Sequence, residues 1–236
     1  MAKINRKHLK EDRFAEEVGH SVEYVAHHRK QVILWIAGVV LLVIAVAGYF
    51  RYTQQREIEA RRAFQEAMNL FNGQVETVDP QVGVVTFATN IEKNAKVTEA
   101  FEALAKNYPN RFEGAAAEYY LALNDIDQGR REEGEKRLRT AMNERNQEAA
   151  ALARLALANL LKAGDKKDEA RELYQYLIDH PTNLVPAPRA QLALAELLIE
   201  SDPEKAREIL VSLQQMPGAI SVMAVNLMSR LPASIQ

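Results

Sequence analysis

An uninterrupted apolar stretch at residues 32–50 constrains this chain more than any other feature. Its 19 residues include no charge, no amide side chain and no proline. As a helix it would measure about 29 Å, close to the thickness of the hydrocarbon core of a bilayer. Because lipid offers the backbone no hydrogen-bond partners, such a segment crosses a membrane as a single helix. Trp35 near one end and Tyr49 and Tyr52 at the other are typical of the membrane–water interface.

This stretch has two other interpretations. A helix in the core of a soluble protein would carry a polar stripe, which is absent here. A cleaved signal peptide is a real competitor, because Ala45-Val46-Ala47 has the small-x-small form that signal peptidases accept. The preceding tail of about thirty residues is long for such a peptide, however, and the apolar run continues to Phe50. We therefore favour an intact anchor.

The chain accordingly divides into a tail at 1–31, an anchor at 32–50 and a domain at 51–236. In the tail, apolar residues recur at helical spacing, which predicts an amphipathic helix next to the membrane; they are Phe14, Val18, Val22 and Val25. Basic residues flank both ends of the anchor, so charge alone does not orient it.

Composition narrows the possible functions. The chain has no cysteine, which excludes disulfides, thiol catalysis and thiolate metal sites. The formal net charge is −2, and the domain is mildly acidic without a basic stripe, which argues against binding to nucleic acid.

The sequence contains none of four common functional motifs: a phosphate loop, a zinc helix motif, a nucleophile elbow or a dinucleotide fingerprint. His180, the one histidine beyond the tail, precedes Pro181 at a predicted helix end, where it helps to cap carbonyl groups. We expect no enzyme activity, no cofactor and no metal site.

The domain begins with a helix and a long irregular segment. No glycine or proline interrupts residues 51–71, so the membrane helix should continue through them. Residues 73–96 are predicted to form a loop with a turn at Asp79-Pro80. Within this loop, residues 82–87 are apolar and β-prone. They would either pair with a client protein or fold over the first helix pair.

From Val97 onward the chain repeats itself. Residues 155–161 match residues 192–198 at an offset of 37, and residues 168–173 match residues 204–209 at an offset of 36. Each copy consists of a helix, a short turn and a second helix. A last helix at 219–231 is expected to cover the apolar face of the final copy.

The repeats resemble the tetratricopeptide repeat family over most of residues 55–215. The family places small residues where helices cross, an aromatic residue in the second helix and a closing proline. In the best copy these positions are Leu157, Ala158, Leu161, Ala170, Tyr174 and Pro181. In an earlier copy Gly134 stands where alanine is usual. The resemblance implies an all-α fold: one transmembrane helix followed by an α-solenoid of about four helix pairs.

Arrays of this kind mostly bind other proteins, with the first helix of each pair lining the concave side. Aligning the copies by their crossing alanines places six residues there: Tyr119, Leu123, Asn159, Lys162, Glu196 and Ile199. The set is mixed and has no strong net charge. Arrays that clamp a carboxyl terminus have a lysine where Leu155 stands here, so that type of recognition is not indicated.

The complete plan resembles the YfgM-like family of bacterial membrane proteins, which are ancillary to the SecYEG translocon. This resemblance implies a single-pass protein of the inner membrane with a cytoplasmic N-terminus and a periplasmic repeat domain. Its partners would be translocon subunits, unfolded clients or periplasmic chaperones, together with the lipid around residues 32–50. Two alternatives remain: an envelope scaffold for an outer-membrane or cell-division complex, and an inward-facing cytoplasmic scaffold.

Overall fold

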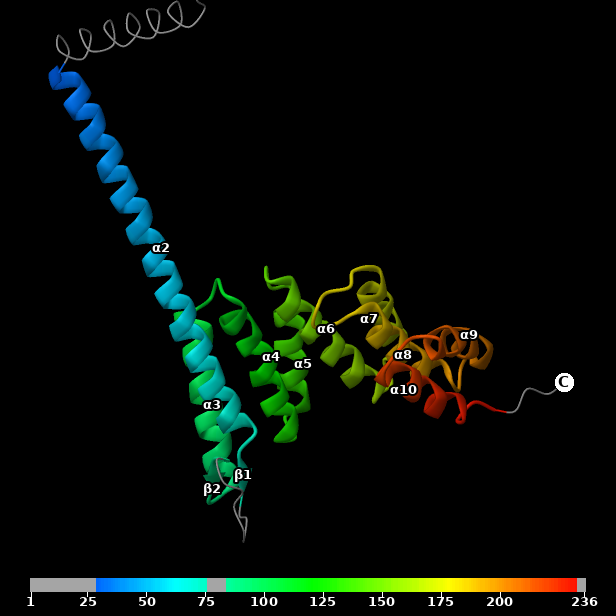
Figure 1. Ribbon diagram of the computed structural model, residues 1–236. Helices are drawn as coiled ribbons and strands as arrows, with labels where there is room; N and C mark the ends of the chain where they lie inside the picture. The colour runs from blue at the N-terminus through cyan, green and yellow to red at the C-terminus, as the bar shows by residue number, and fades with distance from the viewer. Residues whose placement is uncertain (1–28, 76–83, 233–236) are drawn as a thin grey trace, which may run out of the picture. The chain divides into compact units, whose positions relative to one another are not determined.

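The computed structural model describes residues 29–75 and 84–232, and the chain divides between Glu57 and Ile58 into two units (Figure 1). The predicted amphipathic helix of the tail lies outside the described residues. The fold is all-α, with one two-stranded pair of very short strands. The expected class and the array of about four helix pairs are therefore confirmed.

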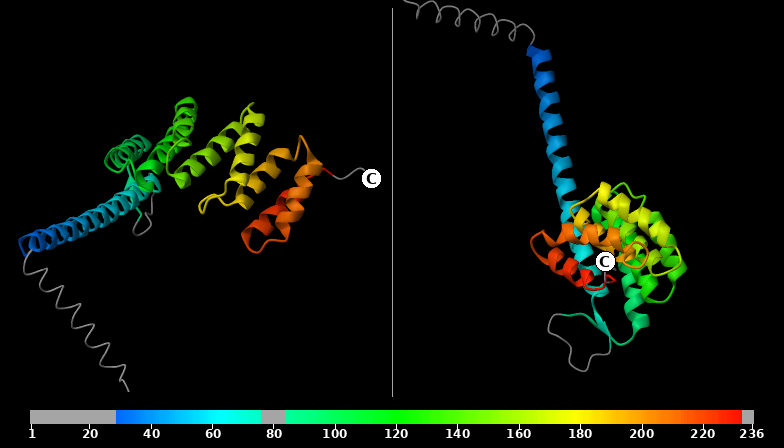
Figure 2. Two further views of the ribbon diagram at one scale, coloured as in Figure 1. Left: turned by 90° about the horizontal axis from the view of Figure 1, so that it is seen from above. Right: turned by 90° about the vertical axis from the view of Figure 1, so that its right-hand side faces the viewer.

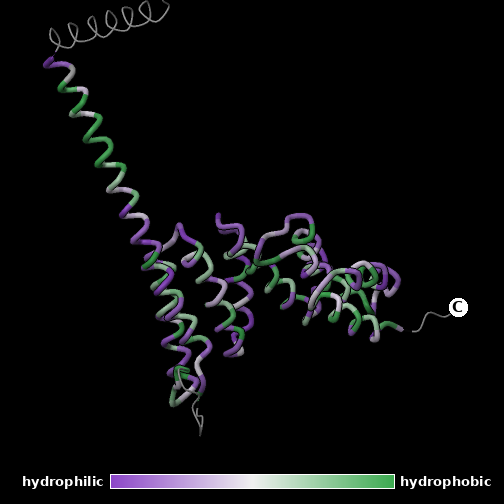
Figure 3. The backbone as a smooth tube through the Cα atoms, in the orientation of Figure 1, coloured by the Kyte–Doolittle hydropathy of each residue, from purple (hydrophilic) through white to green (hydrophobic). Residues whose placement is uncertain are grey.

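Helix α2 spans Arg29–Phe71 without a break. The part of α2 before Glu57 contains the apolar stretch. The most hydrophobic window of this stretch has a mean hydropathy of 2.7, and none of it is buried among the described residues. The large apolar side chains from Ile33 to Phe50 are between 45% and 77% exposed. Figure 3 shows this half of α2 as a continuous hydrophobic segment. The helix is long and apolar enough to cross a membrane.

Aromatic rings hold the first helix pair together. This pair consists of the second part of α2 and helix α3 (Asn90–Asn107). Phe101 of α3 is fully buried, and its ring lies 6.4 Å from that of Phe64 and 6.2 Å from that of Phe71, measured between centroids. The ring of Tyr120, from the next helix, stacks on Phe101 at 5.0 Å. Such ring pairs add to the stabilisation that comes from their burial.

The connection within the first pair differs from the loop expected at 73–96. Strand β1 (Gln74–Val75) pairs in parallel with strand β2 (Thr86–Phe87), and the Phe87 side chain is buried. The described end of the β-prone segment therefore folds onto its own domain. Helix α3 begins at Asn90, well before residue 96. The side chain of Thr89 accepts from the Glu92 backbone N–H at 3.1 Å, and the Glu92 carboxylate accepts from the Ala88 N–H at 3.2 Å. Thr89 thus caps the start of the helix, and Glu92 holds the residue before the cap.

Three further pairs follow along the chain: α4 (Phe112–Asp127) with α5 (Arg131–Ala141), α6 (Gln147–Lys162) with α7 (Lys167–Asp179), and α8 (Ala187–Leu198) with α9 (Pro203–Gln214). Figure 2 shows these pairs following one another, each turned relative to the one before. Local sequence explains two of the turns between helices. Gly129, after α4, has a positive φ of 79°. The Asp202 side chain accepts a hydrogen bond from the Lys205 N–H at 3.2 Å, which caps α9 before Pro203.

Small residues allow the helices of each pair to cross closely. Ala170 of α7 and Ala206 of α9 are fully buried, as the repeat pattern requires. Gly134 of α5 occupies the equivalent crossing, where a β-carbon would lie 2.5 Å from Cγ1 of Ile126 and 3.0 Å from the carbonyl oxygen of Ala122. The glycine is therefore needed because no room exists for a methyl group.

Helix α10 (Ala219–Met228) closes the array. Its inner side packs on α8 and α9 in a cluster with Ala195, Leu210, Leu213 and Ala224. The helix ends at Met228, three residues earlier than expected. Beyond it the backbone N–H groups of Arg230 and Leu231 donate to carbonyls three residues back, which tightens the chain into turns.

Candidate protein-binding face

The first helices of successive pairs form one continuous side of the array. Helix α4 packs against α6, α6 against α8, and α8 against α10. Among the described residues, no comparable contacts join α5 to α7 or α7 to α9. Because the first helices approach one another more closely than the second helices do, they lie on the inside of the curve. We call this side the inner face, and all six residues predicted for binding come from its helices or their ends.

Two of these residues form an ion pair across neighbouring helices. Nζ of Lys162, the last residue of α6, lies 2.6 Å from a carboxylate oxygen of Glu196 on α8. The other carboxylate oxygen of Glu196 lies 3.2 Å from the guanidinium of Arg230, which follows α10. The hydrogen bond from Lys162 lowers the pKa of Glu196, although partial desolvation opposes it. Sequence analysis did not identify Arg230, because it lies beyond the repeat copies. The charged end of Lys162 is therefore held in an ion pair between α6 and α8.

Asn159 of α6 is exposed, yet its side chain is oriented by a buried tyrosine. The hydroxyl of Tyr174, on α7, donates to Oδ1 of Asn159 at 2.7 Å. Burial raises the pKa of Tyr174 above its ordinary value, so this hydroxyl stays protonated and remains a donor. The amide group of Asn159 is left on the inner face in a fixed orientation, where it can donate to a backbone carbonyl of a bound segment.

Tyr119 and Leu123 supply the apolar part of the face from helix α4. Both are half-buried. The ring of Tyr119 packs edge-to-face on Tyr120 at 4.8 Å and touches the main core cluster, and burial raises the pKa of its hydroxyl. A rigid, partly exposed tyrosine offers contact area at a low cost in conformational entropy.

Ile199 does not belong to the exposed part of this face. It is the C-cap residue of α8 and is only 7% exposed, because it packs into the main core cluster. The repeat alignment equates it with Lys162, whose long side chain carries its charge out to the surface. Isoleucine has no polar end to carry outward, so at the equivalent position it packs inward. Ile199 is therefore a core residue, and five of the six predicted residues remain available for contact.

A family model for the tetratricopeptide repeat-like domain matches residues 23–177 of the chain. This chain belongs to that family. The matched region includes α2 and ends within α7, and the pair α8–α9 beyond it repeats the same packing of tetratricopeptide helices. No curated protein and no solved structure matches the chain.

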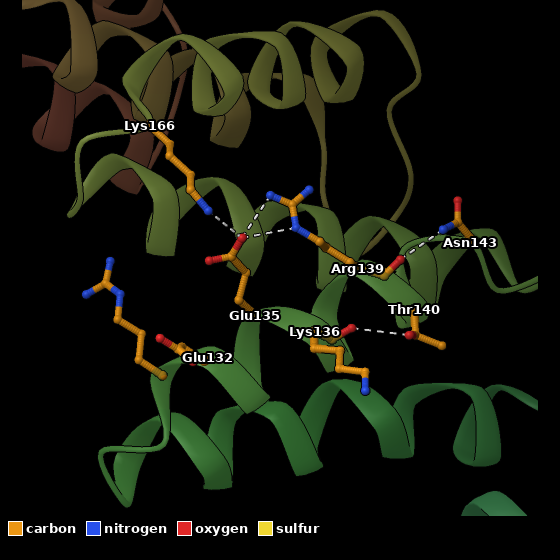
Figure 4. Close-up of a pocket in the computed structure, with 8 residues that line it drawn as sticks. Glu132, Glu135, Lys136, Arg139, Thr140, Asn143 and Lys166 are labelled. Carbon is orange, nitrogen blue, oxygen red and sulfur yellow. Dashed lines mark hydrogen bonds and ion pairs between the residues drawn. The ribbon is translucent and has the colours of Figure 1, made fainter.

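A depression in the described part of the tetratricopeptide array lies along α5, away from the six predicted residues. It has a volume of about 880 Å³ and is lined by Arg131, Glu132, Glu135, Lys136, Arg139, Thr140, Asn143 and Lys166. Figure 4 shows the carboxylate of Glu135 facing both Arg139 and Lys166. Glu135 pairs with both Arg139 and Lys166, each at 2.9 Å, and Arg139 reaches Glu169 of α7 at 2.6 Å. These ion pairs join α5 to α7.

The histidine of the tetratricopeptide domain, His180, has structural partners. His180 is the C-cap of α7: its Nδ1 lies 3.1 Å from the carbonyl oxygen of Tyr176, and its ring stacks on Tyr176 at 4.3 Å. Among residues 29–75 and 84–232, no three histidine or acidic side chains are grouped as metal ligands would be. The histidine therefore completes a helix end, as its position before Pro181 indicated.

Proposed function

We propose that this chain is a membrane-anchored protein-interaction module whose inner face binds extended segments of other proteins without catalysis. Tetratricopeptide repeat-like domains are generally interaction modules. The observation that carries the proposal is the composition of the inner face. It combines half-buried Tyr119 and Leu123 with the oriented amide of Asn159 and the neutralised pair of Lys162 and Glu196. A surface that offers apolar contacts and amide hydrogen bonds accepts many sequences weakly.

Residues 32–50 are proposed as a permanent anchor. The uncovered apolar part of α2 supports this, although a signal sequence would have the same length and composition. If the anchor is retained, the mature protein keeps its first residues and stays in the membrane pellet after alkaline carbonate extraction. A mature N-terminus at Gly48 would show instead that the segment is cleaved.

The location and partners are proposed from the resemblance to the YfgM-like family. The N-terminus would be cytoplasmic and the repeat domain would lie on the periplasmic side of a bacterial inner membrane, next to the Sec translocon. There the inner face would hold translocon subunits, emerging envelope proteins or their chaperones. Weak and tolerant binding suits this role, because emerging chains have diverse sequences and must be released. An envelope scaffold would bind one fixed partner.

Site-specific photo-crosslinking in intact cells tests this proposal. A photoreactive phenylalanine analogue at Tyr119 preserves the aromatic ring, and a second one at exposed Asn159 probes the polar part of the face. Both positions should trap translocon subunits or several different envelope proteins, identified by mass spectrometry.

Lys136 and Thr140 on α5 provide matched controls, because they line the depression away from the six predicted residues. They should trap much less of the same products. Equal yields from the two sets of positions would exclude the inner face as the binding site. A single cell-division or outer-membrane complex at Tyr119 and Asn159, without translocon or client products, would establish the scaffold function instead.

A further inference from the structure

The outward side of helix α10 is apolar and uncovered. Val222, Val225 and Met223 are 61%, 54% and 49% exposed, and Met216 in the preceding turn is 38% exposed. Val222 and Val225 are three positions apart and lie on the side opposite Ala224, which is fully buried against the array. Helix α10 thus has large apolar side chains on both sides, and those on the outward side have no partner among the described residues.

The packing of α10 indicates what kind of group should cover this side. Helix α10 contacts α8 and α9 and so occupies the place of a first helix in a further pair. In the preceding pairs a second helix covers the first: α7 packs on α6, and α9 packs on α8. The exposed side of α10 therefore continues the helix–helix interface of the array. Terminal repeats that face water need a polar outer surface, and here Val222, Met223 and Val225 are exposed beside only two polar residues, Asn226 and Ser229.

The charge pattern limits the occupant further. No charged residue occurs between Glu208 and Arg230, although 26% of the chain is charged. A partner that binds through charge complementarity has nothing to pair with on this surface. A second copy of the same helix meets no repulsion there, and it brings an identical uncovered side that is also removed from water.

We propose that α10 is a self-association surface on which the α10 helix of a second copy packs. A two-fold axis through the contact would make each α10 the missing second helix of the other copy. Such an interface is isologous, so Val222 and Val225 of both copies lie near the axis. The contact area of one ten-residue helix is small, which predicts a reversible dimer. None of the six residues predicted for binding lies on α10, and this proposal does not depend on the function of the inner face.

Disulfide trapping in native membranes tests the proposal on the full-length chain. The sequence contains no cysteine, so single replacements give unambiguous products. Val222→Cys and Val225→Cys would be oxidised with copper phenanthroline and analysed by non-reducing electrophoresis. Glu208→Cys is the matched control, because Glu208 is exposed on the neighbouring helix α9. A disulfide requires β-carbons about 4 Å apart, so one of the two α10 variants should give on the order of ten times more dimer than the control.

A second variant separates a specific contact from chance collision. Val222→Asp introduces a charge at an exposed position, so circular dichroism should show unchanged helix content. Combined with Val225→Cys, it should reduce the dimer to the level of Glu208→Cys. Dimer yields that are equal at all three positions, or that persist with Val222→Asp, would overturn the proposal. Crosslinks from Val222→Cys to a different protein would also overturn it, because they would show that another partner covers α10.

Discussion

The first helix pair and the later pairs pack in different ways. Between α2 and α3 the space is filled by rings, with Phe101 in contact with Phe64, Phe71 and Tyr120. In the pairs α6–α7 and α8–α9 the crossings are made at alanines such as Ala170 and Ala206, and leucines fill the layers between them. The same architecture is therefore reached by two kinds of core.

This difference explains why the repeat pattern is clear in one region and faint in the other. A close crossing admits only alanine or glycine, so the permitted residues recur at fixed spacing. A core of rings fills a larger volume and can be built from several positions, so it leaves no fixed spacing in the sequence. The alanine crossings should tolerate no added volume, and the aromatic core should tolerate no lost volume.

The largest effect is expected from removing a ring in the first pair. Phe101→Ala deletes a fully buried side chain that contacts three other rings, and should lower the free energy of unfolding by about 3–5 kcal/mol. Urea unfolding of a fragment that starts at Ile58 would measure this. Phe101→Leu, which keeps much of the volume, should cost clearly less. Equal losses for both would show that ring geometry, more than volume, holds this pair.

An added side chain at an alanine crossing should have a smaller but definite effect. Ala170→Leu forces a larger group between α6 and α7, and we expect a loss of about 1–3 kcal/mol in the same unfolding experiment. Ala163→Leu is the control, because Ala163 is exposed at the end of α6. If both variants were equally stable, the crossing would have free space and the proposed difference between the two cores would be incorrect.

Gly134→Ala tests the tightest crossing. Replacing glycine by alanine inside a helix ordinarily stabilises a protein by up to about 1 kcal/mol. Here the new methyl group would meet Cγ1 of Ile126 at 2.5 Å, so we expect a net loss on the order of 1 kcal/mol. In an Ile126→Ala background the obstructing carbon is absent, and the penalty should shrink. A double-mutant cycle of unfolding free energies would detect this coupling, and strict additivity would argue against it.

The smallest effect is expected at the ion pair of the inner face. Lys162→Ala should cost less than about 1 kcal/mol at pH 7, because both partners are partly exposed. The pKa of Glu196 is lower when folded than when unfolded, so its stabilisation is complete above about pH 4.5 and is lost as the pH falls through the folded value. The difference between wild type and variant, measured by unfolding at both pH values, should therefore be smaller at about pH 3 than at pH 7. A difference that grows on acidification would contradict this sign.

The sequence predicts the pairs well where local rules and packing agree. Asp202-Pro203 marks the start of α9, and the crossing alanines fix the register of α6 to α9. The sequence also indicates the early start of α3, since Thr89 and Glu92 stand at the spacing of a capping box. The sequence analysis assigned these two residues to a loop because they follow the β-prone segment.

The binding face is less predictable because exposure depends on contacts between distant helices. Lys162 and Ile199 occupy matching repeat positions, but only the contacts of α8 reveal that Ile199 is buried. Similarly, Arg230 reaches Glu196 from beyond the repeats, across 34 positions in the sequence. The rule that first helices form the inside of the array places the six residues on α4, α6 and α8 or their ends, but it does not tell which of them are exposed.

The unequal contacts of the two sides have a mechanical consequence. The first helices touch one another from pair to pair, whereas each second helix touches the next pair through its first helix, and α5 and α7 are also joined by an ion pair. Bending that opens the outer side therefore strains partly exposed ion pairs, while compression of the inner side is resisted by packed side chains. The array should therefore resist an increase in its curvature more strongly than a decrease. A bound segment could then change the curvature of the inner face at little energetic cost, and segments of different thickness could fit the same surface.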